Sequence, residues 1–192
     1  MKKYLIGLFI FSLLSLNFAL AEDLKFSAAN YDEAAKQESK IEFKMESTKL
    51  GLVTTGFTSY VRDFVIHYDK SSNAFDNVVV TIMANSLDTD NSSRNEKMYD
   101  LCLSVSKYKE ITVRLTGKVE LSDTPRPFPA LLNIRGKDNK IDILLRLVKE
   151  GEKEFVQGEA KVSLKGLEIP DPSIFIAKVK DQVNLNFKIF LH

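Results

Sequence analysis

The sequence predicts an all-β fold, either an antiparallel barrel or a two-sheet sandwich, and three features support this prediction. Stretches in which apolar and polar residues alternate recur along the chain, and short turn-forming segments separate them. The clearest stretch is residues 110–121, EITVRLTGKVEL, where every second residue is apolar except Gly117. Alternation of this kind gives a strand one wet face and one dry face. One helical pattern, at residues 93–105, interrupts the strands.

The first 21 residues have the pattern of a secretory signal peptide. Lys2 and Lys3 precede an apolar run, and Ala19 and Ala21 occupy the positions that a signal peptidase requires. We expect cleavage after Ala21 and export to the periplasm of a Gram-negative-type bacterium, or secretion; an uncleaved anchor is the alternative. The apolar run is short for a membrane span, so no stable span is expected after cleavage.

Composition and charge narrow the classes of function for the rest of the chain, which has the size of one domain. The 27 Lys and Arg nearly balance the 26 Asp and Glu, and their mixed order gives no reason to expect a nucleic-acid partner. Cys102 is the single cysteine, so no internal disulfide is possible. The only histidines are His67 and His192, and the sequence contains no catalytic triad pattern, zinc-ligand spacing or phosphate loop. We therefore expect no enzymatic activity, metal or cofactor.

The predicted elements follow from the alternation and the turn residues. A loose polar lead-in is expected over residues 22–38, with a short helix as the alternative, and the barrel domain over residues 39–192. Strands are predicted at about residues 40–46, 60–69, 77–87, 110–121, 130–134, 141–147, 156–164 and 183–191. Loops or turns are predicted at residues 50–59, 71–73, 135–139, 149–152 and in a longer segment with Pro170 and Pro172.

Two local signals refine this order. Pro125, Pro127 and Pro129 are placed in a connection between strands, because proline lacks the amide donor that a central strand needs. Ser93 and Glu96 fit a capping box, which predicts the start of the helix. The apolar face of that helix would carry Met98, Leu101, Cys102 and Val105.

The apolar faces of the strands are expected to point inward. In an outer-membrane barrel they would face lipid. The opposite face, which includes Lys40, Glu42, Arg114, Lys118 and Lys161, would then crowd its charges into a narrow interior. An interior enclosed by eight strands is either filled by side chains or holds one small ligand. The pattern alone leaves both open, and a filled core is the more conservative interpretation.

Four separated parts of the chain together resemble the YceI-like family of exported bacterial proteins, over about residues 39–191. They are residues 41–45 with 56–57 and 66–69; residues 78–82 with 85–89 and Arg94; residues 132–136; and residues 160–169. The second is the most specific, because VVVTI, NSLDT and Arg94 match the family's VxVTI, SLDT and R. The departures are Asn95 for the usual Asp, Met98 for Leu, Ser47-Thr48 for a common histidine, and residues 165–167 for a DFG-like passage.

The resemblance implies an eight-stranded antiparallel lipocalin-like barrel with one short flanking helix. It also implies a lipid-type ligand, an isoprenoid, quinone or fatty amphiphile, sequestered or carried in the interior; burial of such a tail is favoured by about 25 cal/mol per Å². The candidate lining residues are Phe43, Met45, Phe64, Ile66, Ile82, Leu115, Leu132, Ile134, Leu145, Val162, Leu185 and Phe187.

An alternative function is a structural or interaction protein. Its barrel would be filled, and loops or a sheet edge would bind a protein partner. A homodimer is also left open.

Several other residues have both a structural and a functional interpretation. Arg62 is interpreted as a solvated loop charge rather than a contact for a ligand's polar head. Asp88, Thr89 and Arg94 are expected to fix the turn from strand to helix, with Arg94 pairing a carboxylate or carbonyls. Cys102 is expected to be a buried, inert thiol.

Gly117 and Gly158 fall on inward-facing positions of their strands. A missing side chain leaves room for a ligand or permits a bend in the barrel, and we favour the bend.

Overall fold

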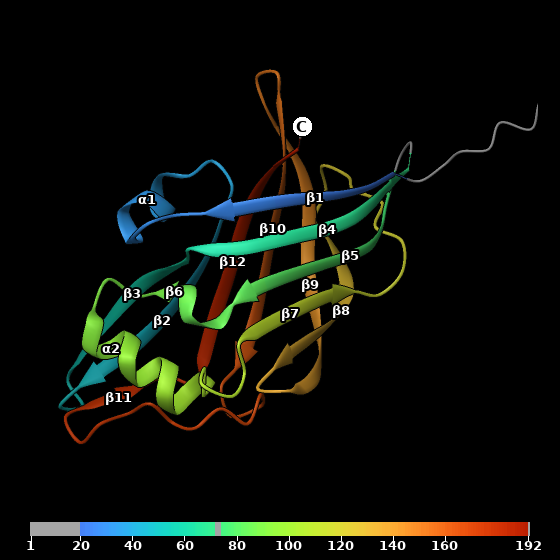
Figure 1. Cartoon of the computed structure of the whole chain (residues 1–192). Coiled ribbons are helices and arrows are strands. Elements are labelled where there is room, and N and C mark those ends of the chain that lie inside the picture. The colour runs from blue at the N-terminus through green and yellow to red at the C-terminus, as the bar shows by residue number, and fades with distance from the viewer. Residues whose placement is uncertain (1–19, 72–73, 192) are drawn as a thin grey trace, which may run out of the picture.

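The computed structural model describes residues 20–71 and 74–191, which form one curled antiparallel sheet (Figure 1). The predicted all-β class is confirmed. The strands are β1 (Leu20–Ser27), β2 (Lys40–Lys49), β3 (Val53–Val61), β4 (Asp63–Ser71), β5 (Ala74–Met83), β6 (Leu87–Asp88), β7 (Glu110–Leu115), β8 (Arg126–Ile134), β9 (Lys137–Glu150), β10 (Lys153–Ser163), β11 (Ala177–Val179) and β12 (Gln182–Leu191). The helical segments are α1 (Tyr31–Lys36), the 3₁₀ turn η1 (Ala84–Ser86), α2 (Ser92–Lys97) and the π-helical turn η2 (Met98–Leu103).

The sheet curls until its two borders meet. Hydrogen-bonded neighbours follow the order β1-β4-β5-β7-β8-β9-β10-β12-β2-β3-β6, with β11 beside β2. Strand β3 continues into β4 across Arg62, so the chain itself joins the two borders. The amide of Ala28 donates to the carbonyl of Arg62 at 2.9 Å. The amide of Arg62 donates to the carbonyl of Ser86 at 3.0 Å. The resulting barrel is lipocalin-like, as expected.

The structure has twelve strands in its described residues instead of the predicted eight. Strand β6 comes from the stretch predicted as one strand at 77–87, which η1 interrupts. Strands β1 and β11 and most of β3 lie in segments that were not predicted as strands. The predicted signal peptide lies outside the described residues except for its last two positions, which begin β1. The predicted turn at 71–73 also falls largely outside them.

Residues 20–27 form a strand, so the prediction of a loose lead-in is wrong here, although the alternative of a short helix is confirmed by α1. Every residue of β1 pairs with β4. The apolar alternation is weak because Glu22 shares the inward face with Leu24 and Phe26, where it accepts a hydrogen bond from Tyr68 Oη at 2.7 Å. Burial, followed by this bond, raises the pKa of Tyr68.

The segment predicted as a loop at 50–59 is mostly strand β3, so that prediction is wrong. Its pairing with β2 runs residue by residue from Val53 opposite Lys49 to Tyr60 opposite Glu42. The first four residues of β3 are exposed. A strand exposed on both faces is under no pressure to alternate, which explains why the sequence carried no signal.

The placement of Pro127 and Pro129 in a connection is also wrong, because both lie in β8. Both prolines pair with β9 on one side of β8. On the other side, the ladder with β7 covers only Ala130 to Asn133 and does not reach the prolines. The carbonyl of Pro129 accepts from the amide of Thr116 at 2.9 Å, so the missing amide also points away from β9. Prolines are tolerated at such a border because no ladder bond is lost.

The predicted helix is confirmed, but Ser93 does not cap it. Asn91 is the cap, and its side chain accepts from the amide of Arg94 at 2.9 Å. The following π-helical turn shifts the predicted apolar face, leaving Leu101 38% exposed while Cys102 and Leu103 are buried.

The strand predicted at 110–121 ends at Leu115, and Gly117 has a φ of 89° that favours glycine. The bend expected at Gly117 is therefore confirmed. Beyond it, Val119 bridges Phe75 through two backbone hydrogen bonds.

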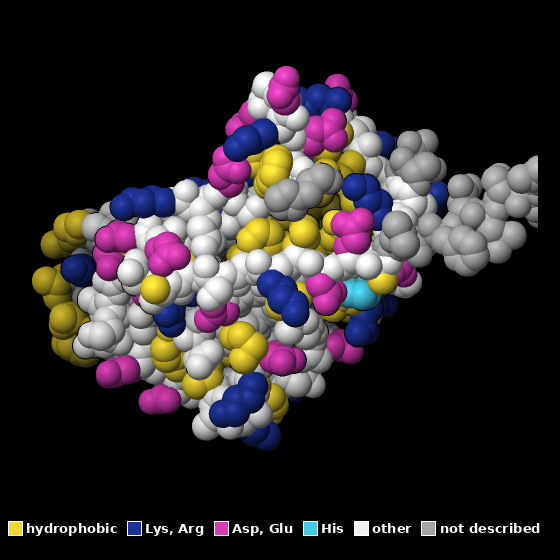
Figure 2. Space-filling model, turned by 45° about the horizontal axis from the view of Figure 1, so that its top comes forward, with side chains coloured by type: hydrophobic (Ala, Val, Ile, Leu, Met, Phe, Trp, Pro, Cys, Tyr) yellow, Lys and Arg dark blue, Asp and Glu magenta, His cyan; other side chains and the backbone are white. Residues whose placement is uncertain are grey.

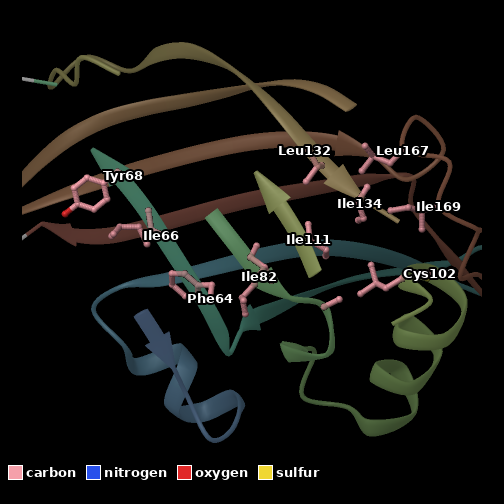
Figure 3. Close-up of a cluster of buried hydrophobic side chains, with 14 residues drawn as sticks. Phe64, Ile66, Tyr68, Ile82, Cys102, Ile111, Leu132, Ile134, Leu167 and Ile169 are labelled. Atoms are coloured by element: carbon pink, nitrogen blue, oxygen red, sulfur yellow. The ribbon is translucent and has the colours of Figure 1, made fainter. Parts of the chain in front are cut away.

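The charged residues of the strands face solvent, as predicted. Lys44, Arg114 and Lys161 are exposed, and Figure 2 shows charges of both signs spread over the surface. Inside, side chains from β4, β5, β7 and β8 point toward one another (Figure 3). Leu167 and Ile169, from the loop after β10, pack with Cys102 and close one part of the barrel.

Gly158 makes room for an aromatic ring within β10, and the bend expected there stays a prediction. Gly158 lies opposite Phe187 in the ladder of β10 and β12, and a Cβ placed on it would lie 2.0 Å from Cζ of Phe187. The ring thus crosses the strand where any side chain would stand. This contact occupies space that an inward-facing glycine otherwise leaves for a ligand.

Gly158→Ala should lower the free energy of unfolding by about 1–3 kcal/mol, because Phe187 must leave its position. Urea denaturation measures the change. Gly56→Ala is the matched control: it also lies in a strand, but its added Cβ meets nothing closer than 3.7 Å. Phe187→Leu should offset part of the loss in the double variant, so strictly additive effects would contradict the packing described here.

Candidate ligand cavity

The barrel interior contains a cavity of about 640 Å³. Its wall is almost entirely apolar and draws side chains from every long strand of the barrel. The interpretation of a filled core is therefore wrong. Side-chain size contributes to this, because small residues in the wall, such as Ala160, extend only a short way into the interior.

Eleven of the twelve predicted lining residues face this cavity: Phe43, Met45, Ile66, Ile82, Leu115, Leu132, Ile134, Leu145, Val162, Leu185 and Phe187. Phe64 does not line it. Its ring stacks on Phe26, with centroids 4.6 Å apart, and is only 2% exposed. The unpredicted strand β1 thus covers Phe64. Contact of these residues with a ligand stays a prediction.

Sequence reasoning missed other lining residues in the same alternation. Ile41, Ile111, Val113, Ile143 and Val156 share the phase of predicted neighbours, and that phase was sufficient to find them. Tyr68 and Phe75 also line the cavity, where their rings meet edge to face with centroids 5.4 Å apart. Their side of the cavity is formed partly by Leu24 of β1.

The cavity has one distinctly polar end, between the end of β2 and α2. Its polar lining residues are Ser47, Lys49, Thr89, Ser93, Arg94 and Lys97. Lys49 and Ser93 are exposed as well as lining, so the cavity reaches solvent there. The alternation of β2, continued past Met45, points to Ser47 and Lys49. No sequence pattern pointed to the α2 residues as lining, because only the fold brings α2 over the barrel.

Arg94 is the most buried cation at this end. Its Nη2 donates to the carbonyl of Thr89 at 2.6 Å, and its guanidinium lies over the ring of Phe57, 4.1 Å from the centroid. Within the described part of the chain, Arg94 Nε is buried without a hydrogen-bond partner. Burial lowers the pKa of Arg94, and the nearby charge of Asp90 opposes this shift.

An unsatisfied buried donor costs about 1–3 kcal/mol. Arg94 also lines the cavity, so its charge is available to the head of a ligand at the polar end. Arg94 therefore favours a ligand whose head carries a hydrogen-bond acceptor.

The turn before α2 is fixed as predicted. Asn95 Oδ1 accepts from the amide and the hydroxyl of Thr89, at 2.9 and 2.6 Å. Asn95 Nδ2 in turn donates to Asp88 Oδ1 at 2.9 Å. This network holds the first turn of α2, and hence Arg94, against the barrel.

Arg62 is not the solvated loop charge that we expected. Its Nη1 donates to the carbonyl of Ala29 at 3.2 Å, and its Nε lies 3.5 Å from Asp88 Oδ2. The side chain is 26% exposed. Arg62 thus fastens the end of β1 and the β6 segment at the corner where the sheet borders meet, and it does not line the cavity.

Cys102 is buried in the cavity wall, which confirms the prediction of a buried thiol. Burial raises its pKa, and the neighbouring charges of Lys97 and Arg135 only partly oppose this effect. His67, in contrast, lies on the outer side of β4, with Nδ1 2.7 Å from Asp23 Oδ1.

Two kinds of feature are absent from the described residues, a metal-binding cluster and a membrane-spanning helix. Residues 20–71 and 74–191 contain no group of three or more His, Cys, Asp or Glu side chains that could hold a metal ion. In the same part of the chain, no helix has the length and apolar character needed to cross a membrane.

These features define a class of protein: an antiparallel lipocalin-like barrel with an apolar interior cavity and one polar end. Comparison with family models gives a match to the YceI-like domain over residues 33–191. The chain therefore belongs to the YceI-like family. None of the curated proteins matches the sequence.

Solved structures share the fold at low sequence identity. Burkholderia cenocepacia BcnA is 16% identical, with a TM-score of 0.62, over 80% of this chain and 96% of that one. A polyisoprenoid-binding domain from Saccharophagus degradans, implicated in plant cell wall breakdown, is 15% identical, with a TM-score of 0.57, over 79% and 95%. The Campylobacter jejuni YceI protein is 20% identical, with a TM-score of 0.54, over 69% and 82%.

Cys102 should react slowly with a thiol-specific reagent at pH 8, because burial restricts access and the raised pKa reduces the thiolate fraction. The rate should be at least about tenfold below that of an exposed thiol and should rise when urea unfolds the protein. The comparison is Phe175→Cys in a Cys102→Ala background, since Phe175 is 98% exposed. Equal rates for the two folded proteins would contradict the burial of Cys102.

Proposed function

We propose that this protein binds an amphiphile with a long apolar chain, of the isoprenoid or fatty type, inside the barrel. The observation that carries the proposal is the cavity of about 640 Å³ with an almost wholly apolar wall. Its volume falls within the range of about 300–1,000 Å³ that is typical of small-molecule sites. A tail that buries about ten methylene groups would gain roughly 8 kcal/mol before the cost of its lost freedom.

The polar end supports an amphiphile over a plain hydrocarbon. Arg94 offers a donor, and Ser47, Lys49, Ser93 and Lys97 supply further polar atoms around the opening. A phosphate, carboxylate, hydroxyl or quinone oxygen fits this set, because each accepts hydrogen bonds from such groups. The apolar tail would then extend toward Tyr68 and Phe75.

The S. degradans domain that shares the fold binds a polyisoprenoid. Its ligand class is consistent with the cavity described here, and the family membership makes this class the first to test. The competing function, a filled barrel that acts only through its loops, is less favoured because the interior is hollow.

We also propose that the protein is exported and acts as a binder rather than as a catalyst. Export is supported by the N-terminal pattern of basic, apolar and small residues. Binding alone is supported by the chemistry of the lining, where no histidine within residues 20–71 and 74–191 accompanies the hydroxyls of Ser47, Thr89 and Ser93. A recovered ligand that stays chemically unchanged on incubation would support this role, and its conversion would contradict it.

Native mass spectrometry of protein released from the periplasm without detergent tests binding and export together. The expected protein mass begins at Glu22 and carries a stoichiometric apolar adduct that organic solvent extracts. Ala160→Phe, which adds a ring to the cavity wall, should lower the adduct occupancy, whereas Leu144→Phe on the exposed outer side should not. An apo mass throughout, with no uptake of added lipid, would count against the proposal.

Arg94→Met should weaken binding of a carboxylate- or phosphate-bearing amphiphile by about tenfold, since a hydrogen bond to a charged group contributes about 1.5–3 kcal/mol. Binding of a matched probe without the polar head should hardly change. Fluorescence titration with the two probes separates this effect from a structural one, because loss of the turn at Thr89 would weaken both. Equal weakening of both probes would show that Arg94 does not contact the head.

A further inference from the structure

A group of exposed apolar side chains stands beside the polar end of the cavity. It consists of Leu50, Leu52 and Val53 at the β2–β3 turn and Ile174, Phe175 and Ile176 before β11, and we call it the apolar tip. Phe175 is 98% exposed and Leu52 is 85% exposed. Figure 2 shows hydrophobic side chains gathered at the edge of the molecule over these two segments. The amide of Leu50 donates to the carbonyl of Ile176 at 2.9 Å, so the segments form one surface.

The fold does not require apolar residues at these places. Leu50 and Gly51 both have positive φ, at 48° and 69°. They are the central pair of a turn that the amide of Leu52 closes by donating to the carbonyl of Lys49 at 2.9 Å, and Asn-Gly would adopt this pair of conformations at less cost. Phe175 and Ile176 occupy the apex of a second tight turn, closed by two hydrogen bonds between Ile174 and Ala177. Turn apices usually carry polar residues or glycine. An exposed apolar group of this size commonly marks a contact surface.

The charges around the apolar tip are basic. Lys49 and Lys178 are exposed. They lie in the ladder of β2 and β11, where Lys49 is opposite Ala177 and Lys178 is opposite Thr48. In residues 20–71 and 74–191, neither lysine forms an ion pair with a carboxylate. Glu46 is held by Lys180, and Asp171 accepts from the amide of Ser173 at 2.8 Å. Its hydrogen bonds to Ser173, followed by the charges of Lys178 and Lys97, lower the pKa of Asp171, so this one carboxylate faces two of the cations. Lys97 adds a third cation, with Nζ 3.3 Å from the carbonyl of Ser173.

The apolar tip is continuous with the cavity. Lys49, Ile174 and Ala177 line the cavity and also belong to the two segments that carry or border the tip. The tip consists of two protruding turns rather than a groove. Protruding apolar turns with a basic border match the boundary between headgroups and acyl chains of an anionic bilayer.

We propose that the apolar tip docks on an anionic lipid bilayer, so that the polar end of the cavity opens at the membrane surface. A lipid would then pass between bilayer and barrel without exposing its chain to water. The proposal rests on the proposed function for the identity of the cargo, but docking itself depends only on the tip and its lysines.

Flotation with vesicles of phosphatidylcholine containing about one quarter phosphatidylglycerol tests the docking. The wild-type protein should bind these vesicles, and binding should weaken in pure phosphatidylcholine and at high salt. Leu52→Ser/Phe175→Ser should weaken binding by about tenfold or more. Leu101→Ser/Leu144→Ser is the matched control, because these leucines are exposed at 38% and 37% outside the tip.

Leu50→Asn separates a docking role from a structural one. It replaces an apolar side chain by a residue that suits the positive φ, so the melting temperature should stay equal or rise while vesicle binding falls several-fold. A wild-type protein that does not float with the vesicles, or tip variants that float as well as wild type, would overturn the proposal. Light scattering without vesicles tests the alternative of a dimer. If the wild type is a dimer and Leu52→Ser/Phe175→Ser is a monomer, the tip binds a second copy of the chain and the docking proposal is overturned.

A soluble fatty-chain probe keeps this proposal distinct from the proposed function. Leu52→Ser/Phe175→Ser should bind the probe in solution as wild type does, while failing to float. Wild-type protein that floats but takes up no probe would leave docking intact and contradict the cargo. Uptake of the probe without flotation would support the cargo and overturn docking.

Discussion

The phase of alternation in each strand is the constraint on which the rest of the structure depends. Because side chains point to opposite faces with a period of two, a slip of one residue would exchange the two faces. Arg114 and Lys161 would then enter the barrel in place of Leu115 and Val162. Burying such charges without partners costs far more than any hydrogen bond in the ladder returns. The register of each strand is therefore tightly specified, and the curled sheet follows from that register. Arg62 lies at the corner where the two borders of the sheet meet.

The same constraint explains why the interior is dry but not full. Inward positions must be apolar, yet nothing requires their summed volume to fill the space. Ala160 in the wall is small, and the ring of Phe187 lies over Gly158, where any larger side chain would stand. The loop that carries Leu167 and Ile169 closes one part of the barrel against Cys102. What is left is a cavity with an apolar wall, suited to a chain that water excludes.

Among the described residues, most of the polar side chains that line this apolar interior gather at one end, where β2 ends and α2 lies over the barrel. The network of Asp88, Thr89 and Asn95 holds α2 in place, and Arg94 stands within it as a cavity-lining cation with one unpaired donor. The apolar tip adjoins this end. A polar opening next to protruding apolar turns with exposed lysines places the head of a ligand, the basic charges and the apolar contact surface at one pole of the molecule, as the proposed transfer from a bilayer would require.

The sequence by itself determined the all-β class, the inward set of residues and the turn that positions Arg94, because each follows from local periodicity or from side-chain bonds over a few positions. It also located most of the cavity wall, since lining residues share the phase of their strands. The strands β1 and β3 were decided only in the tertiary structure, because their pairing with β4 and β2 stabilises segments with little alternation of their own. The tertiary structure also decided that Phe64 does not line the cavity, because Phe26 covers it. It decided the polar end as well, which forms where segments distant in sequence meet. Periodicity reports which way a side chain points, whereas the volume left between facing side chains exists only once the sheet has closed.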